Sequence, residues 1–318
     1  MKGLWLENQC LSYRDQLPLP ALGRDEVLVK LHLAGICSTD LEMVKGYYKF
    51  TNIPGHEFVG EVVQSPANPG LLNQRVVGEI SIYCGVCPTC LAGNTSHCEN
   101  RRTLGIQNYP GVFAEYLRLP ARNLHLVPDS VSDEKAVFTE LLAAALEIQQ
   151  QIHISPGMRV LVVGAGRLGL LIAMTLGLKG CELQVVARRH KPIEILSNLG
   201  IRCISPDQVE RGRSDLVVEV TGSPQGFALS RTAVRPRGIL VLKSTFAGDL
   251  TLNMSSVVVD EIQLIGSRCG PFKPAIKLME NDLIDPTILI DSIYPLEKGL
   301  QAFDRASSPG VLKVLLKP

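Results

Sequence analysis

Four cysteines lie close together in one segment of the chain, CGVCPTCLAGNTSHC, separated by two, two and seven residues: Cys84, Cys87, Cys90 and Cys98. Thiolates are soft ligands, and four of them can enclose Zn²⁺ in a tetrahedral shell. Two disulfides or four unrelated thiols are the alternatives. Because the opening residues, MKGLWLENQC, do not look like a secretory signal, a reducing compartment is favoured. We therefore predict a zinc site, and a structural one, since four sulfurs leave no position for water.

A second possible metal site lies upstream, in the segments GICSTDLE and PGHEFVGEV. Cys37, His56 and Glu57 provide a thiolate, an imidazole and a carboxylate, a set that suits a zinc ion with one open position. Thr39 lies two residues after Cys37, where its hydroxyl could carry a proton away from a reacting oxygen. A lone His-Glu pair is more often ordinary surface. The prediction of a metal site is strengthened because these residues precede the cysteine segment and a nucleotide-binding motif.

That motif is VLVVGAGRLGLLIAMTLG. Arg159–Val163 has the composition of a buried strand, 170–178 has helical character, and 183–187 predicts a second strand. Between the first strand and the helix lies a GxGxxG pattern, whose candidate cofactor-binding residues are Gly164, Gly166, Arg167, Leu168 and Gly169. Glycines there allow a tight turn and let a pyrophosphate approach the amides of a helix N-terminus. The stretch is apolar enough to resemble a membrane span, but Arg167 at its centre favours a strand–helix–strand unit.

The residues after the second strand bear on which dinucleotide is bound. A site that prefers NAD places Asp or Glu at the end of this strand, where it bonds the ribose 2′-hydroxyl. This chain has Ala187 there, followed by Arg188 and Arg189. Guanidinium groups can bind a 2′-phosphate in bidentate fashion, whereas a carboxylate would repel it. We predict NADP, with NAD as the alternative; a solvated basic turn would have the same composition.

The order of these motifs resembles the medium-chain dehydrogenase/reductase family, which contains zinc-dependent alcohol, polyol and sugar dehydrogenases. The GxCxTD motif of that family corresponds to 35–40, its GHE motif to 55–57, and its EPL segment to 140–142, where the proline is replaced. The resemblance implies that Cys37, His56 and either Glu57 or Glu140 hold a catalytic zinc with water. It also implies that Thr39 belongs to the proton relay, and that the protein is a homodimer or homotetramer.

The activity implied is hydride transfer between NADP(H), or NAD(H), and a secondary alcohol, polyol or sugar or its carbonyl partner. Two departures from the family pattern put the proton exit route in question: Glu42 and Glu147 stand where histidines are common. Three further positions are candidates for cofactor contact, each at or just after the end of a predicted strand: Thr221, Ser244 and Arg268.

Composition fits a two-domain enzyme. The chain has 318 residues and a formal net charge of +1, which gives no reason to invoke nucleic acid or a membrane surface. We expect it in the cytoplasm. Short β-type runs predict a GroES-like β-barrel catalytic domain at 1–128, completed by a helix and closing strand at 291–318. A helix is expected over Asp133–His153. Alternating strands and helices predict an α/β fold for 129–290, a doubly wound parallel sheet of the Rossmann type, with the active site in the cleft between the domains.

Two rival functions remain open. One is a non-catalytic NADP-binding scaffold or sensor, which the replaced relay histidines would allow. The other is a zinc-independent enone reductase of the same superfamily. The complete set at Cys37, His56, Glu57 and Glu140 argues against the first, and retention of both metal sites against the second. Metal content separates them: we expect two zinc ions per chain for the dehydrogenase and one for either rival.

Overall fold

The structure is a computed structural model that describes residues 1–245 and 249–318. The chain divides into two compact units: Met1–Glu140 with Phe272–Pro318, and Leu141–Pro271. Residues 129–140 and 272–290, which the sequence assigned to the cofactor domain, cluster with the first unit. In the sequence, the second unit therefore lies between the two segments of the first. Within the described residues, no helix has the length and apolar character needed to cross a membrane.

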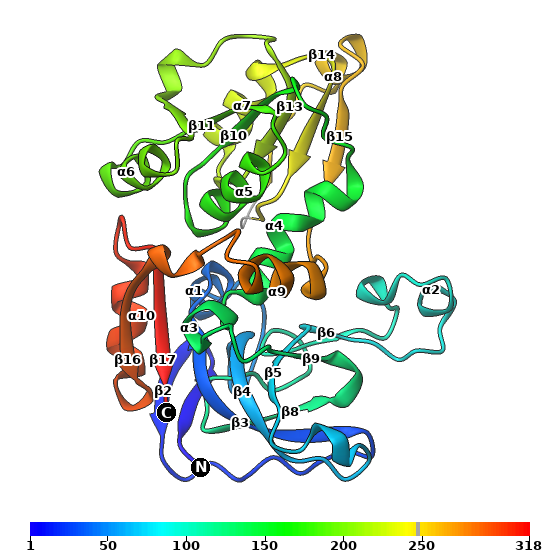
Figure 1. The fold of residues 1–318 in the computed structure, drawn as a ribbon, viewed down its shortest axis with the longest axis vertical. Helices are drawn as coiled ribbons and strands as arrows, with labels where there is room; N and C mark the ends of the chain where they lie inside the picture. The colour runs from blue at the N-terminus through cyan, green and yellow to red at the C-terminus, as the bar shows by residue number, and fades with distance from the viewer. Residues whose placement is uncertain (246–248) are drawn as a thin grey trace. The chain divides into compact units, whose positions relative to one another are not determined.

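The first unit is built mainly from antiparallel strands (Figure 1). Its elements are β1 (Gly3–Glu7), β2 (Cys10–Arg14), β3 (Glu26–Gly35), α1 (Ser38–Val44), β4 (Glu57–Gln64), η1 (Pro69–Leu71), β5 (Arg75–Gly78), β6 (Ser81–Ile82), α2 (Pro88–Leu91), η2 (Thr95–His97), β7 (Arg102–Thr103), β8 (Tyr116–Pro120), η3 (Ala121–Asn123), β9 (Leu124–Leu126), α3 (Asp133–Ala136), α9 (Phe272–Glu280), η5 (Pro286–Leu289), β16 (Ile290–Pro295), η6 (Leu296–Lys298), α10 (Gly299–Ser307) and β17 (Lys313–Lys317).

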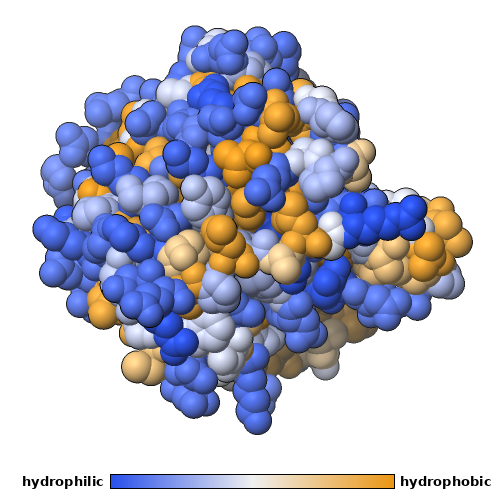
Figure 2. Space-filling model, turned by 90° about the horizontal axis from the view of Figure 1, so that it is seen from below, coloured by the Kyte–Doolittle hydropathy of each residue, from blue (hydrophilic) through white to orange (hydrophobic). Residues whose placement is uncertain are grey.

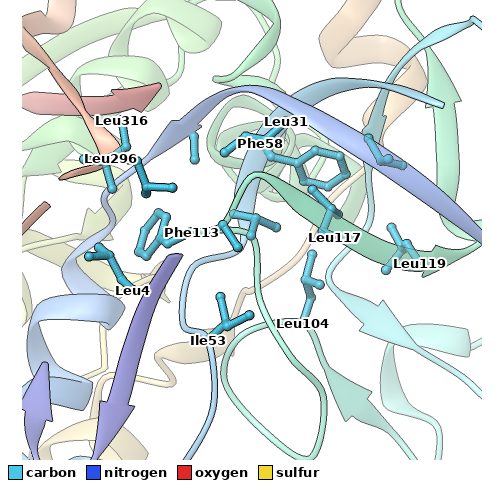
Figure 3. Packing of buried hydrophobic residues seen from close by; sticks show 14 of the residues in the cluster. Leu4, Leu31, Ile53, Phe58, Leu104, Phe113, Leu117, Leu119, Leu296 and Leu316 are labelled. Atoms are coloured by element: carbon cyan, nitrogen blue, oxygen red, sulfur yellow. The ribbon is translucent and has the colours of Figure 1, made fainter. Parts of the chain in front are cut away.

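The main sheet of this unit has the order β16-β17-β3-β4-β5-β9, with β8 also paired to β3. Strand β17 comes from the end of the chain and pairs antiparallel with β3, Leu315 opposite Gly35. The predicted helix and closing strand at the C-terminus are therefore confirmed as α10 and β17. One apolar cluster fills the unit (Figure 3), and in it the ring of Phe113 meets that of Phe303 edge-on at 5.8 Å.

A small lobe formed by β6, α2, η2 and β7 carries the four-cysteine segment. Its buried cluster consists of cysteine side chains, packed with Tyr83 and Cys84. Apolar side chains instead lie on the outside of the lobe: Val86 and Leu91 are each 76% exposed. Figure 2 shows an apolar patch at the end of the projection that carries α2. Because sulfur atoms take the place of a hydrocarbon core, we expect the fold of this lobe to depend on a ligand that joins them.

The second unit is an α/β domain (Figure 1). Its strands form a six-stranded sheet, parallel throughout, in the order β12-β11-β10-β13-β14-β15. This is the doubly wound order of dinucleotide-binding domains, in which β11 and β12 are added on one side of β10, and β13, β14 and β15 on the other. The elements are α4 (Thr139–Gln151, which begins in the first unit), β10 (Arg159–Val163), α5 (Arg167–Gly177), β11 (Glu182–Val186), α6 (His190–Asn198), β12 (Arg202–Ile204), η4 (Pro206–Gln208), β13 (Ser214–Glu219), α7 (Pro224–Ala233), β14 (Val234–Leu242), α8 (Met254–Val259) and β15 (Gln263–Gly266).

The prediction of a single helix over Asp133–His153 is wrong in one respect, because the structure has two helices there. The short helix α3 ends at Ala136 and α4 begins at Thr139. Between them the side chain of Phe138 is completely buried, and the hydroxyl of Thr139 donates a hydrogen bond to the carbonyl of Ala136. The break between α3 and α4 coincides with the burial of Phe138 and with this hydrogen bond. The segment contains no glycine or proline that would have predicted the break.

Candidate active site

Cys37 lies at the point where β3 has ended and α1 begins, as the residue before the first helical position. Its backbone N–H donates to Asp40 Oδ2 at 2.8 Å, which satisfies one of the unpaired amides of the helix start. The hydroxyl of Thr39 lies 3.9 Å from Cys37 Sγ. The turn of α1 thus brings the thiol and the predicted relay hydroxyl together, with the Asp40 carboxylate fully buried behind them.

His56 is held by the loop that leads into β4. Gly55 has φ +96°, and a Cβ there would lie 2.7 Å from the ring of Phe113, so only glycine fits. His56 is 3% exposed, and its Nδ1 lies 3.3 Å from Asp40 Oδ1. Although burial opposes protonation of the ring, the carboxylate of Asp40 raises the pKa of His56 well above its usual value. Asp40 therefore fixes the Cys37 segment by a hydrogen bond and brings its other carboxylate oxygen close to the ring of His56.

Glu57 begins β4 and is completely buried. One carboxylate oxygen, Oε2, accepts from Lys313 Nζ at 2.5 Å, and both partners of this ion pair are inaccessible to solvent. The other oxygen, Oε1, has no hydrogen-bond partner among the described residues. A buried carboxylate oxygen left without a partner is costly, which makes Oε1 a candidate ligand atom for a metal ion.

Ligand atoms of Cys37, His56 and Glu57 all lie within 4.8 Å of one another. This set of sulfur, nitrogen and oxygen donors, with one oxygen unpartnered, fits a zinc ion with an open position. Glu140, the alternative third ligand, is the second residue of α4 and is not part of that group in the described chain. Of the two residues that stand where relay histidines are common, Glu42 forms a surface ion pair with Lys45 at 2.8 Å, and Glu147 belongs to α4.

The four cysteines of the lobe form a second possible metal group, again with their ligand atoms within 4.8 Å of one another. Cys98 Sγ lies 3.6 Å from Cys84 Sγ and 3.9 Å from Cys87 Sγ. A tetrahedron with Zn–S bonds of about 2.3 Å separates its sulfurs by about 3.8 Å, whereas a disulfide requires about 2.05 Å. Backbone N–H groups of Val86 and Cys87 lower the pKa of Cys84 to about 6, whereas burial raises the pKa of Cys90 to about 12, so the cluster without a metal does not hold four thiolates. The geometry fits zinc and not disulfides.

In the second unit, the glycine-rich turn connects β10 to α5 at the point where the strand order reverses. Gly164 has φ +117°, and a Cβ on Gly169 would lie 2.1 Å from the carbonyl oxygen of Gly164. Both positions therefore require glycine. Gly166 precedes the first helical residue, and nothing lies within 4 Å of the place where its Cβ would be. Arg167 and Leu168 form the first turn of α5. Open space at a helix N-terminus fits a dinucleotide pyrophosphate.

The other predicted cofactor residues follow strands of the same sheet. Arg188 and Arg189 are separated from the end of β11 by Ala187, and Arg189 is the residue before α6. Thr221 follows β13, and its N–H and hydroxyl both donate to Glu219, at 2.7 and 2.6 Å. Ser244 follows β14, and Arg268 follows β15. These residues all lie near the carboxyl ends of parallel strands, the edge at which such sheets bind ligands.

Two residues near the zinc-type group were not assigned a role from the sequence. Asp40 was visible only as a neighbour of Cys37, and its contact with His56 links two separate segments. Lys313 stands in the apolar run VLKVLLKP, and a charged residue inside a buried strand was the available signal. Its partner, Glu57, is far away in the sequence, so no local pattern could identify the pair.

Comparison with known proteins identifies the family. Residues 23–129 match the family described as alcohol dehydrogenase GroES-like domain, and residues 127–317 match the one described as glucose dehydrogenase C-terminus. The chain belongs to the zinc-dependent medium-chain dehydrogenase/reductase family. It is therefore an oxidoreductase of the alcohol and polyol dehydrogenase class, and the fold predicted from the sequence is confirmed.

Similar proteins span nearly the whole chain. D-arabinitol dehydrogenase 1 of Uromyces fabae is 28% identical, over 94% of this chain and 92% of its own length. D-arabitol-phosphate dehydrogenase of Enterococcus avium is 29% identical, over 95% and 92%. Among solved structures, a protein assigned as a zinc-binding dehydrogenase from Sinorhizobium meliloti 1021, bound to NADP, superposes with a TM-score of 0.91. It is 25% identical and is aligned over 100% of this chain and 99% of its own.

Proposed function

We propose that this member of the family is a zinc-dependent dehydrogenase that uses NADP(H) to interconvert a polyol, sugar or other secondary alcohol and its carbonyl partner. The observation that carries the proposal is the group of Cys37, His56 and Glu57, in which a fully buried carboxylate oxygen has no partner among the described residues. Such a donor set in a dehydrogenase fold supports a catalytic zinc rather than a scaffold without chemistry.

The residues at this site would have three roles: binding the metal ion, orienting a ligand and transferring a proton. Cys37, His56 and Glu57 would hold the ion, with Glu140 as the alternative third ligand. Zinc bound there supplies a Lewis acid that acidifies the substrate hydroxyl. Asp40 keeps the ring of His56 oriented through Nδ1, and thereby leaves its other nitrogen to face the ion. The hydroxyl of Thr39, close to Cys37 Sγ, would accept the substrate proton at Oγ1 while donating its own proton onward to solvent.

The lobe that contains Cys84, Cys87, Cys90 and Cys98 would hold a second zinc ion, which has a purely structural role. This proposal is supported by the sulfur separations and by the composition of the lobe's buried cluster. We therefore expect two zinc ions per chain.

The dinucleotide would lie along the carboxyl ends of the parallel sheet and would supply or accept the hydride. Gly164, Gly166 and Gly169 leave room for the pyrophosphate, with Arg167 and Leu168 at the helix start. Arg188 and Arg189 support NADP over NAD, because no carboxylate stands between them and the end of β11. Contacts from Thr221, Ser244 and Arg268 would complete the site.

The substrate class is proposed from the relatives. The two enzymes named above are, by their names, an arabinitol dehydrogenase and an arabitol-phosphate dehydrogenase. Their names support a polyol, free or phosphorylated. The test is a screen of polyols, polyol phosphates, sugars, secondary alcohols and ketones with NADP(H) and with NAD(H), following nicotinamide absorbance. Turnover of one class with NADP preferred supports the proposal; dinucleotide binding without turnover of any class counts against it.

A further inference from the structure

Lys313 is the largest charged side chain that is fully buried in the described residues, with 1% of its surface exposed. Its ammonium group contacts three segments that are far apart in the sequence. It donates to Glu57 Oε2 at 2.5 Å and to the carbonyl of Ile36 at 3.3 Å, and it lies 5.8 Å from the centre of the Phe138 ring. A buried lysine is costly, and its pairing does not by itself stabilise a fold more than apolar residues would. Its position therefore calls for another explanation.

Each contact of Lys313 falls beside a proposed zinc ligand. Ile36 precedes Cys37, Glu57 follows His56, and Phe138 lies two residues before Glu140. The next residue of the same strand, Val314, accepts a hydrogen bond from the N–H of Ile36 at 3.0 Å. Strand β17 thus fixes the Cys37 segment by its backbone, while Lys313 joins that segment to the start of β4. The spacing between Cys37 and His56 depends on this strand from the end of the chain.

Lys313 also determines which oxygen of Glu57 is available. The ammonium group occupies Oε2 and leaves Oε1 unpartnered. The carboxylate fits in this orientation because Gly35 has no side chain: a Cβ there would lie 2.3 Å from Oε2. The charges of the buried groups balance in this arrangement once a divalent ion is bound. The buried carboxylates of Asp40 and Glu57 and a Cys37 thiolate carry three negative charges, which one lysine and one divalent ion neutralise.

We propose that Lys313 is a positioning residue of the zinc site: it holds Glu57 with Oε1 turned toward the metal and fixes the separation of Cys37 and His56. The inference rests on the proposed function, since it presupposes that this group binds zinc. It predicts that the C-terminal strand must be in place before the site reaches its binding geometry. A merely structural role for Lys313 would change stability and leave the properties of the metal unchanged.

The test uses the full chain loaded with zinc and compares Lys313→Met, of similar length but uncharged, with Lys317→Met, an exposed position of the same strand. Zinc per chain and the rate of zinc transfer to a chelator are measured, together with the absorption spectrum after cobalt substitution. We expect Lys313→Met to retain the lobe zinc but to release the second ion about 10 to 100 times faster, with a changed cobalt spectrum. Lys317→Met should behave as the wild type.

Release of the second ion from Lys313→Met at the wild-type rate, with an unchanged cobalt spectrum, would overturn the inference. If Lys313→Met does not fold, Lys313→Leu, which likewise removes the donor to Glu57, takes its place with the same expectations and the same overturning result. The zinc content of the wild-type protein distinguishes failure of the proposed function from failure of the role of Lys313. If it holds only the lobe zinc, the proposed function itself fails; if it holds two ions and the variant holds both equally well, the role of Lys313 alone fails.

Discussion

The carboxylate of Asp40 joins the two segments that carry the candidate zinc ligands: Oδ2 accepts from the backbone N–H of Cys37 at 2.8 Å, and Oδ1 lies 3.3 Å from His56 Nδ1. Asp40 is completely buried, and His56 is nearly so. A carboxylate behind a metal-binding histidine fixes the orientation of the ring and strengthens it as a ligand. The arrangement supports a site whose geometry exists before zinc arrives.

We predict that Asp40→Asn weakens zinc binding at this site and lowers turnover, each by about 10- to 100-fold, because the amide cannot fix the imidazole in the same way. Zinc affinity by competition with a chelator and kcat measure the effect. Lys45→Gln, at an exposed residue next to the same helix, is the matched control and should change neither quantity. Equal behaviour of Asp40→Asn and the control would show that Asp40 does not orient a ligand.

The proposed structural zinc of the lobe has its own test. Cys87→Ser should reduce zinc from two ions to one per chain and expose the lobe between residues 83 and 102 to proteases, because its buried cluster is made of cysteines. Zinc analysis and mass spectrometry of limited digests follow both effects. Cys10→Ser, an exposed cysteine outside the lobe, serves as the control. A lobe that keeps its protease resistance after the loss of Cys87 would contradict a structural metal.

Cofactor choice is predicted to depend on the two arginines after β11. Replacing Arg188 and Arg189 together by Ala should raise KM for NADP by about 10- to 100-fold and leave KM for NAD nearly unchanged, since only NADP carries a 2′-phosphate for charge-assisted hydrogen bonds. Arg211→Ala, elsewhere on the same unit, controls for the loss of positive charge. A parallel increase of both KM values would indicate a structural role for the two arginines.

Acid sensitivity of the second unit is predicted from Asp215. Arg159 donates hydrogen bonds to this carboxylate, two from its side chain at 3.1 Å and one from its backbone at 2.8 Å, and Arg235 donates another at 2.6 Å. The hydrogen bonds from Arg159 hold the pKa of Asp215 well below its ordinary value of 3.8. The stabilisation is therefore complete above the unfolded-state pKa and is lost as the pH falls through about 4 and below.

Asp215→Asn should lower the free energy of unfolding by about 1–3 kcal/mol at pH 7, where the charged hydrogen bonds are present. The difference between the variant and the wild type should narrow as the pH falls from 5 to 3, because the Asp215 carboxylate of the unfolded wild type then takes up a proton while that of the folded protein stays charged. Urea denaturation at several pH values measures this. A difference that is the same at pH 3 and pH 7 would show that ionisation of Asp215 contributes nothing.

The sequence was most informative where chemistry requires a local pattern. The glycines of 164–169 and the strand before them were predictable because the turn tolerates no side chain at Gly164 or Gly169. The grouping of the four lobe cysteines was predictable because they lie within one short segment. The alternation of strands and helices likewise indicated a parallel sheet, although the strand order became known only from the structure.

Long-range contacts account for what the sequence did not predict. The pairing of Lys313 with Glu57 and of Asp40 with His56 depends on which strands lie side by side, and no spacing rule encodes it. The boundary at Glu140 and Phe272, rather than at 129 and 290, reflects packing of α3 and α9 with the first unit. The break near Phe138 was missed for the same reason, since burial of that side chain depends on tertiary structure.

The most direct test of the central claim is the zinc content and turnover of the wild type and of Cys37→Ser and His56→Ala, with dinucleotide affinity measured alongside. The proposed mechanism predicts two zinc ions per chain in the wild type and one in each variant. Turnover should be abolished in both variants, while NADP binds nearly as before, because the glycine-rich turn belongs to a separate unit. Two zinc ions in the variants, or turnover that survives loss of the second ion, would contradict a catalytic zinc at this site.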